Sequence, residues 1–175
     1  MGLSLKYIGC DVLRTRGEKV TAFGEALARH LPRMIDILHA EGGVGLAAPQ
    51  VGLSQHFFIV IVNVDDEARE EDEIVLMANA EIREASKEQV VIEEGCLSIP
   101  GLRADVKRPE RIRIAFQDIR GERGELETGG LLARIIQHEL DHCEGVLFID
   151  RLSPARRAVL KRRLGDIERD YAPRN

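Results

Sequence analysis

The sequence predicts an α+β fold in which several short β-strands are mixed with about three helices. Two apolar segments with helical spacing flank a block of strand-like segments, and turn-forming residues separate most of these segments. The 175 residues can bury a substantial core, and no linker rich in Pro, Gly or Ser divides the chain. We therefore expect a single domain over residues 1–175.

Three helices are predicted from spacing and end signals. Apolar residues recur with helical spacing over residues 21–41, and the pair Gly42-Gly43 follows as a stop signal. A second helix is expected over residues 131–144, ended by Gly145. A third begins at Ser153-Pro154, because Ser is a good N-cap and Pro is tolerated at the first helical position.

The strand-like segments lie between the first two helices. FFIVIVNV (57–64) has no polar alternation, which indicates a strand buried on both faces. RIRIAFQDI (111–119) alternates apolar and polar residues, which indicates a half-exposed strand. Two shorter strand candidates are IVLMANA (74–80) and QVVIE (89–93). The segments expected to be irregular are residues 65–73, which are acidic, and residues 118–125.

Composition and charge exclude several functional classes. The chain has a net charge of −5 and no basic block, so binding of nucleic acid through its phosphates is not expected, and neither is a sequence-specific nucleic-acid partner. No apolar stretch is long enough to span a bilayer, and the first residues contain no apolar run typical of a signal peptide. We expect a cytoplasmic protein without a membrane partner, whose three cysteines remain thiols.

The strongest motif is His138-Glu139-Leu140-Asp141-His142, an HExxH pattern inside the second predicted helix. Residues four apart lie on one helical face, so both imidazoles can bind one metal ion, with Glu139 beside them. A helix that carries two histidines by chance is the alternative. The neighbouring residues are apolar, however, and a buried histidine pair without a partner would be costly, which favours the metal.

A catalytic metal site needs a third protein ligand and an open position for water. The preferred candidate is Cys96 in EGCLS (94–98), which follows a predicted strand and a glycine that permits an unusual backbone turn. Glu168 is the alternative, because zinc endopeptidases with HExxH usually take a downstream Glu or His. A lone cysteine is also often a small buried apolar residue, and this interpretation stays open.

The segment GVGLAAPQ (43–50) is rich in small residues that allow another backbone to approach closely. It ends on Gln50, whose amide both donates and accepts hydrogen bonds. A helix C-cap followed by a loop would explain the glycines but neither the alanine pair nor Gln50. The segment lacks the Lys-Ser/Thr ending of a P-loop, so phosphate binding is not expected.

GVGLAAPQ, EGCLS and QHELDH, in this order, resemble the three signature motifs of the peptide deformylases, and the resemblance extends from about Gly9 to Pro154. It implies removal of the formyl group from the N-terminal formylmethionine of new proteins, with release of formate. It also implies antiparallel β-sheets packed around a central helix that carries HExxH, plus N-terminal and C-terminal helices.

The resemblance also implies a reaction mechanism. The ligands of one divalent metal ion would be Cys96, His138 and His142. Fe(II) is the expected native metal, with Zn(II), Ni(II) or Co(II) as alternatives. Water on the metal would attack the formyl carbon while Glu139 acts as general acid and base. The side chain of Gln50 and the backbone N–H of Leu97 would hold the developing oxyanion.

The substrate would lie extended along two backbone segments and place its first side chain in one pocket that prefers Met or norleucine. The backbone segments contain Gly43, Val44, Gly45 and Gly95. The residues implied for the pocket are Val44, Ile92, Leu131, Ile135 and the ring of His138, with Arg103 near the next carbonyl. The expected partners are N-formylmethionyl nascent peptides, and a transient ribosome contact is compatible with this function.

Some residues depart from the family pattern or support the site. Arg134 stands where an apolar residue is common, and we expect it at the pocket mouth with its charge in water. Cys143 adjoins a ligand but points to another helical face, so we do not expect it to bind metal. Glu94 and Asp141 are candidates to accept the second N–H of a ligand histidine, with Arg108 paired to Asp141. The alternative is that both acids are solvated.

Two rival classes stay open on the sequence alone. An HExxH endopeptidase would share the activation of water but cleave internal peptide bonds, and would take its third ligand downstream rather than from Cys96. A non-enzymatic metal-binding module would close the fourth coordination position, and it would need neither Glu139 nor Gln50.

Overall fold

The computed structural model describes residues 2–68 and 70–171. The segment predicted as a fully buried strand forms β2 (Phe57–Ile61), and all five of its residues are buried. Its odd-numbered side chains pack in one cluster with α2 (Leu31–Ala40), and its even-numbered side chains pack in another with α3 (Gly130–Cys143). The apolar run without polar alternation is explained by these two packed faces.

β2 belongs to a five-stranded antiparallel sheet with the strand order β1-β2-β3-β6-β7. The other members are β1 (Gly45–Ala47), β3 (Ile74–Ala85), β6 (Arg111–Gln117) and β7 (Arg123–Gly129). β6 alternates exposed and buried residues in its first half, as its sequence predicts. β1 is an edge strand, so one side of its backbone is not paired within the sheet.

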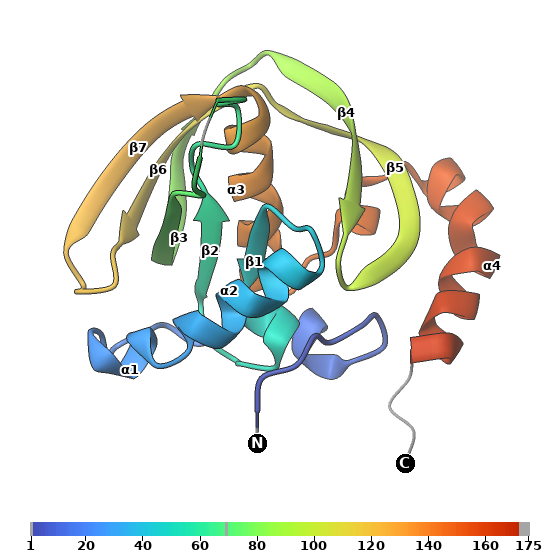
Figure 1. Ribbon diagram of the computed structural model, residues 1–175. Helices are drawn as coiled ribbons and strands as arrows, with labels where there is room; N and C mark the ends of the chain where they lie inside the picture. Colours follow the sequence, from blue (N-terminus) through green and yellow to red (C-terminus); the bar gives the residue numbers. More distant parts are fainter. Residues whose placement is uncertain (1, 69, 172–175) are drawn as a thin grey trace.

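A second sheet consists of the hairpin β4 (Gln89–Cys96) and β5 (Ile99–Pro109). Figure 1 shows α3 between this hairpin and the five-stranded sheet. β5 was not predicted from the sequence, although its buried and exposed residues alternate. This arrangement places the C-terminal end of β4 next to the face of α3 that carries His138 and His142.

The first predicted helix is interrupted. It forms α1 (Glu25–Ala28) and α2, because Pro32 lacks an N–H and favours the first turn of a new helix. α4 (Pro154–Tyr171) packs on the hairpin side through a cluster that includes Leu160, Leu164 and Ile167. Short 3₁₀ turns are η1 (Asp11–Arg14), η2 (Ala48–Val51) and η3 (Phe148–Arg151). In the described part of the chain, no helix has the length and apolar composition to cross a membrane.

Candidate metal centre

Three predicted ligands come together where β4 ends against α3. One ligand atom each of Cys96, His138 and His142 lies within 4.8 Å of the others. The Cys96 Sγ atom is 3.2 Å from Nε2 of His142, and the two imidazole rings are 5.0 Å apart, edge to face. A thiolate and two imidazoles form a donor set for a transition metal with one position left open. Glu168 instead lies on α4 against Gly9.

The surroundings of these three residues fit a metal with a water ligand. Glu139 follows the first histidine and is buried, and its Oε2 atom has no hydrogen-bond partner among the described residues. A buried carboxylate oxygen without a partner is costly. Because Glu139 lies beside the three candidate ligands, water bound to a metal there would supply the missing hydrogen-bond donor.

Glu139 is held against β1 by a close backbone approach. A Cβ atom added at Gly45 would lie 2.7 Å from Glu139 Oε1 and 2.9 Å from Cγ2 of Ile135, so only glycine fits there. Burial raises the pKa of Glu139 to about 7, although the charge of His138 opposes this shift. A carboxyl group with such a pKa can both accept and release a proton near neutral pH.

Gln50, in η2, is fixed by three neighbours. Its Oε1 accepts a hydrogen bond of 2.8 Å from the backbone N–H of Ala47. Its Nε2 donates to Ser98 Oγ at 3.3 Å and lies 3.7 Å from the sulfur of Cys96. The NH₂ group thus points toward the metal-binding cluster, and Leu97 lines the same cavity in the turn between β4 and β5. Ser98 was not identified from the sequence.

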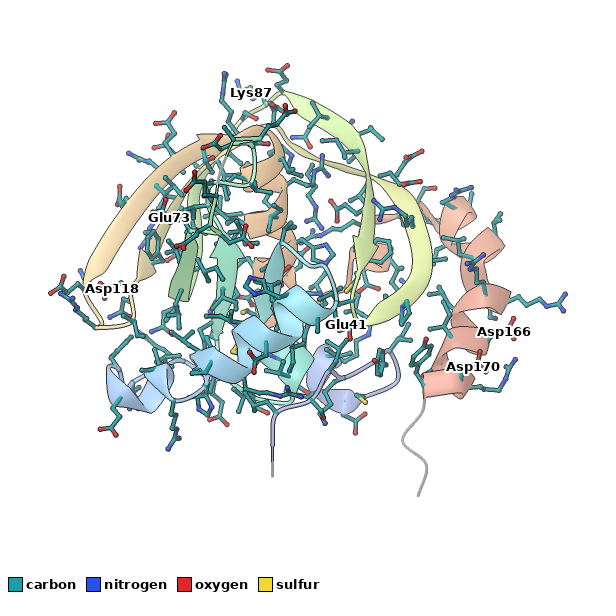
Figure 2. The ribbon with its side chains drawn as sticks, viewed as in Figure 1. Glu41, Glu73, Lys87, Asp118, Asp166 and Asp170 are labelled. Carbon is teal, nitrogen blue, oxygen red and sulfur yellow. The ribbon has the colours of Figure 1, made fainter. Side chains whose placement is uncertain are left out.

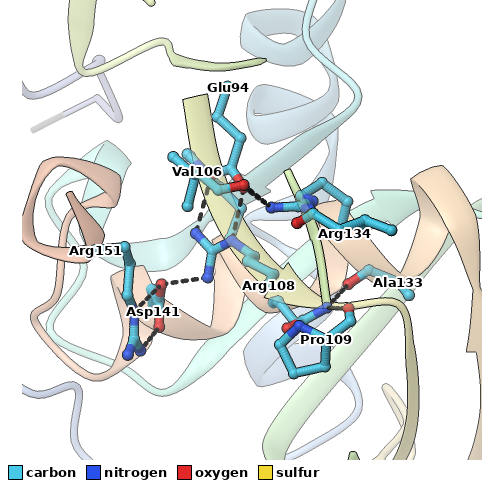
Figure 3. A network of polar contacts seen from close by, with 11 residues as sticks. Glu94, Val106, Arg108, Pro109, Ala133, Arg134, Asp141 and Arg151 are labelled. Carbon is cyan, nitrogen blue, oxygen red and sulfur yellow. Dashed lines mark hydrogen bonds and ion pairs between the residues drawn. The ribbon is translucent and has the colours of Figure 1, made fainter. Parts of the chain in front are cut away.

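A buried network of charged side chains contacts His138 through Glu94. Figure 3 shows Glu94, Arg108, Arg134, Asp141 and Arg151 of this network. His138 Nδ1 is 3.0 Å from Oε2 of Glu94, and Arg108 donates two hydrogen bonds to Glu94, of 2.6 and 2.9 Å. Burial alone would raise the pKa of Glu94, but the hydrogen bonds from His138 and Arg108 hold it well below its usual range. The expectation that Glu94 supports a ligand histidine thus agrees with the geometry.

Asp141 is also buried, but it does not contact a ligand ring. Its carboxylate accepts hydrogen bonds from Arg108 at 2.7 Å and from Arg151 at 2.5 and 3.1 Å. The predicted pair of Arg108 and Asp141 is therefore present. The alternative that Asp141 and Glu94 are both solvated is wrong, since each is 6% exposed.

Arg134 contradicts the expectation that its charge lies in water. The side chain is 4% exposed, and its guanidinium donates three hydrogen bonds of 2.9 Å. The acceptors are Glu94 Oε1 and the backbone carbonyls of Val90 and Val106. Arg134 does line the cavity, as expected, but its guanidinium is hydrogen-bonded inside the protein instead of lying in water, because these acceptors converge on it.

Cys143 lies away from the cluster. It is fully buried between α3 and the five-stranded sheet, and its Sγ donates to the carbonyl of Phe57 at 3.4 Å. Burial raises the pKa of this thiol well above its usual range. These contacts agree with the prediction that Cys143 is a packing residue and not a ligand.

A cavity of about 550 Å³ opens over the cluster. Every residue predicted to contact substrate lines it, namely Gly43, Val44, Gly45, Ile92, Gly95, Arg103, Leu131 and Ile135. Arg103 pairs with Glu93 at 2.7 Å on the outer wall. Glu41 lies at the rim between α2 and the hairpin (Figure 2). The rings of Tyr7 and Tyr171, which are tilted by 40° with their centroids 4.4 Å apart, also line the cavity; no motif marks them, because they lie near opposite ends of the sequence.

Comparison with known proteins gives one consistent result. The sequence profile of the polypeptide deformylase family matches residues 3–158. The peptide deformylase of Thermotoga neapolitana is 46% identical over 163 residues, covering 93% of this chain and 94% of the relative. A plant peptide deformylase structure aligns with a TM-score of 0.88 and 34% identity, covering 97% of this chain and 90% of the other.

The peptide deformylase structure from Thermotoga maritima aligns with a TM-score of 0.79 and 43% identity, covering 88% of this chain and 99% of the other. These likenesses extend over nearly the whole fold described above, including the helix and the hairpin that form the cluster. The chain therefore belongs to the polypeptide deformylase family.

Proposed function

We propose that this chain is a metal-dependent hydrolase that removes the formyl group from the N-terminal formylmethionine of newly synthesised proteins. The observation that carries the proposal is the convergence of Cys96, His138 and His142 within 4.8 Å of one another, beside Glu139. Family membership supports the same reaction. In this proposal the chain acts as a single catalytic domain, with α3 as the central helix that carries the histidine pair.

The chemistry of the three proposed ligands indicates which metal ions the site can bind. When bound, a divalent metal ion supplies a Lewis acid that lowers the pKa of water and polarises the formyl oxygen. The thiolate of Cys96 is a soft ligand and suits Fe(II), which we propose as the native metal, with Zn(II), Ni(II) or Co(II) as alternatives. Cys143 is held elsewhere, so a metal bound by Cys96, His138 and His142 would keep a fourth position for water.

Glu139 moves the proton in the proposed reaction. Its Oε2 atom accepts a proton from water as the water oxygen attacks the formyl carbon. The carbon–nitrogen bond then breaks, Glu139 returns the proton to the amine nitrogen, and formate is released. The Nε2 group of Gln50 and the backbone N–H of Leu97 hold the negative charge on the former formyl oxygen.

The cavity offers two backbone edges to an extended peptide. β1 is unpaired on its outer side, and β4 borders the same cavity, so a peptide can add hydrogen bonds along either strand. Its first side chain would enter the pocket formed by Ile92, Leu131 and Ile135, with Arg103 beside the next carbonyl. A cytoplasmic location and a transient ribosome contact are part of the proposal, because the substrate is a nascent chain.

The proposal is tested with protein loaded with Fe(II) in the absence of oxygen. We expect formate release from formyl-Met-Ala-Ser with one metal ion per chain, and no cleavage of casein. Casein cleavage without formate release would instead indicate an endopeptidase. Bound metal with neither reaction would indicate a non-enzymatic metal-binding module.

A further inference from the structure

Arg134 is a buried cation in the wall of the cavity over the candidate metal site, although the sequence predicts that its charge lies in water. It stands on α3 one turn before His138. On the other side of His138, Asp141 also contributes to the buried network. Arg134, one turn before His138, and Asp141, about one turn after it, therefore both form hydrogen bonds with the β4–β5 hairpin.

The three hydrogen bonds of Arg134 join separate parts of the fold. Figure 3 labels Arg134 and two of its acceptors, Glu94 and Val106. Nη2 binds the carbonyl of Val90 in β4, and Nη1 binds the carbonyl of Val106 in β5 together with Glu94. β4 ends at Cys96, and α3 carries both histidines. One guanidinium thus links the hairpin that supplies the sulfur ligand to the helix that supplies the nitrogen ligands.

Arg134 also completes the partners of Glu94. Oε1 accepts from Arg108 Nε at 2.6 Å and from Arg134 Nη1 at 2.9 Å. Oε2 accepts from Arg108 Nη2 at 2.9 Å and lies 3.0 Å from His138 Nδ1. A carboxylate offers about four lone-pair sites, so these four donors saturate it. Glu94 cannot rotate without breaking a hydrogen bond, and Nε2 of His138 is left for the metal.

The second histidine lacks such support. His142 Nδ1 is buried and has no hydrogen-bond partner among the described residues. The orientation of the two imidazoles is therefore secured unequally, and the ring of His138 is the one tied to the charge network.

We propose that Arg134 is a positioning residue of the metal site. It fixes Glu94, and through Glu94 the ring of His138, while it ties the strand that ends at Cys96 to α3. This inference rests on the proposed function because it concerns the same metal. Its central measurement, the affinity for the metal, does not require turnover.

The test compares two substitutions at Arg134 with one elsewhere in the network. Arg134→Met keeps an apolar stem and removes every donor, whereas Arg134→Lys keeps the charge but cannot reach three acceptors at once. Arg151→Met is the control, because the described hydrogen bonds of Arg151 go to Asp141 and its side chain is 48% exposed. The readouts are the Zn(II) dissociation constant, measured by competition with a chelator, and the visible spectrum of the Co(II)-loaded protein.

We expect Arg134→Met to raise the Zn(II) dissociation constant about 10- to 100-fold, the usual effect of losing support behind a metal ligand. The Co(II) spectrum should change as well, and Arg134→Lys should recover only part of either loss. Arg151→Met should match the wild type in both. If Arg134→Met does not fold, Arg134→Lys alone decides the question, because its buried charge is preserved.

Wild-type affinity and an unchanged Co(II) spectrum in the folded Arg134 variants would overturn the inference, even if their melting temperatures fall. Such a result would mean that Arg134 stabilises the fold without influencing the metal site. It would leave the proposed function intact as long as the wild-type protein releases formate. Absence of formate release by the wild type would defeat the proposed function, whatever the metal affinities of the variants.

Discussion

Replacing Gly45 with alanine should displace the carboxylate of Glu139 without altering any of the three proposed metal ligands. The added methyl group would lie 2.7 Å from Oε1 and 2.8 Å from Cγ of Glu139, and 2.9 Å from a methyl of Ile135. β1 cannot simply retreat, because Gly45 is paired with Val60 in β2. Either Glu139 rotates away or β1 separates from α3.

Both responses have a measurable size. Overpacking of this kind costs about 1–3 kcal/mol, and each kcal/mol lowers the melting temperature of a chain of this length by about 2–4 °C. A misplacement of about 1 Å at a reacting group can lower kcat about 100-fold. We therefore expect Gly45→Ala to bind metal normally, to melt several degrees lower and to lose most of its kcat.

The assay combines formate release, metal analysis and thermal unfolding. Gly165→Ala is the matched control, because a Cβ there would meet only the end of Arg169 at 3.8 Å. This helical substitution should gain about 0.5–1 kcal/mol of stability and leave kcat unchanged. Wild-type kcat and stability in Gly45→Ala would refute the claim that β1 holds Glu139 in place.

Three further predictions address the ligands, the charge network and the pocket. Cys96→Ala should lose tightly bound metal or nearly all turnover, whereas Cys143→Ala should keep its metal and most activity; metal analysis showing the reverse would contradict the ligand set. Asp141→Asn should lower the free energy of unfolding, measured in urea, by about 3 kcal/mol, because the buried guanidinium of Arg108 loses one of its two carboxylate partners. An unchanged free energy of unfolding would refute this prediction. Formyl-Met and formyl-norleucine peptides should have a much higher kcat/KM than formyl-Gly peptides, since the first side chain enters an apolar pocket, and equal values would refute that pocket.

The convergence of Cys96, His138 and His142 could be predicted because metal-binding chemistry restricts both residue type and spacing. Few side chains bind transition metals, and the helical period places His138 and His142 on one face. The buried strand β2 could also be predicted, since its run of β-branched and aromatic residues favours a strand and lacks the polar alternation of a half-exposed one.

The parts that could not be predicted involve charges buried by distant partners. β5 carries Arg108 at a buried position, which in the sequence resembles a solvent-facing residue and hides the alternation of the strand. The position of Arg134 was wrongly predicted for the same reason, because its backbone acceptors lie in two strands, 28 and 44 residues earlier in the chain. A separate difference concerns the turn region, which was expected to extend to residue 125. Residues 123–129 instead form β7.

The most direct test of the mechanism is formate release by Glu139→Gln, compared with wild type, with both proteins loaded anaerobically with Fe(II). Glutamine preserves the size of the side chain but cannot accept the proton, and the residue is not among the three proposed ligands. We predict an unchanged metal content and a kcat lower by at least about 100-fold. A fully active variant, or one that has lost its metal, would contradict the assignment of Glu139 as the group that carries the proton.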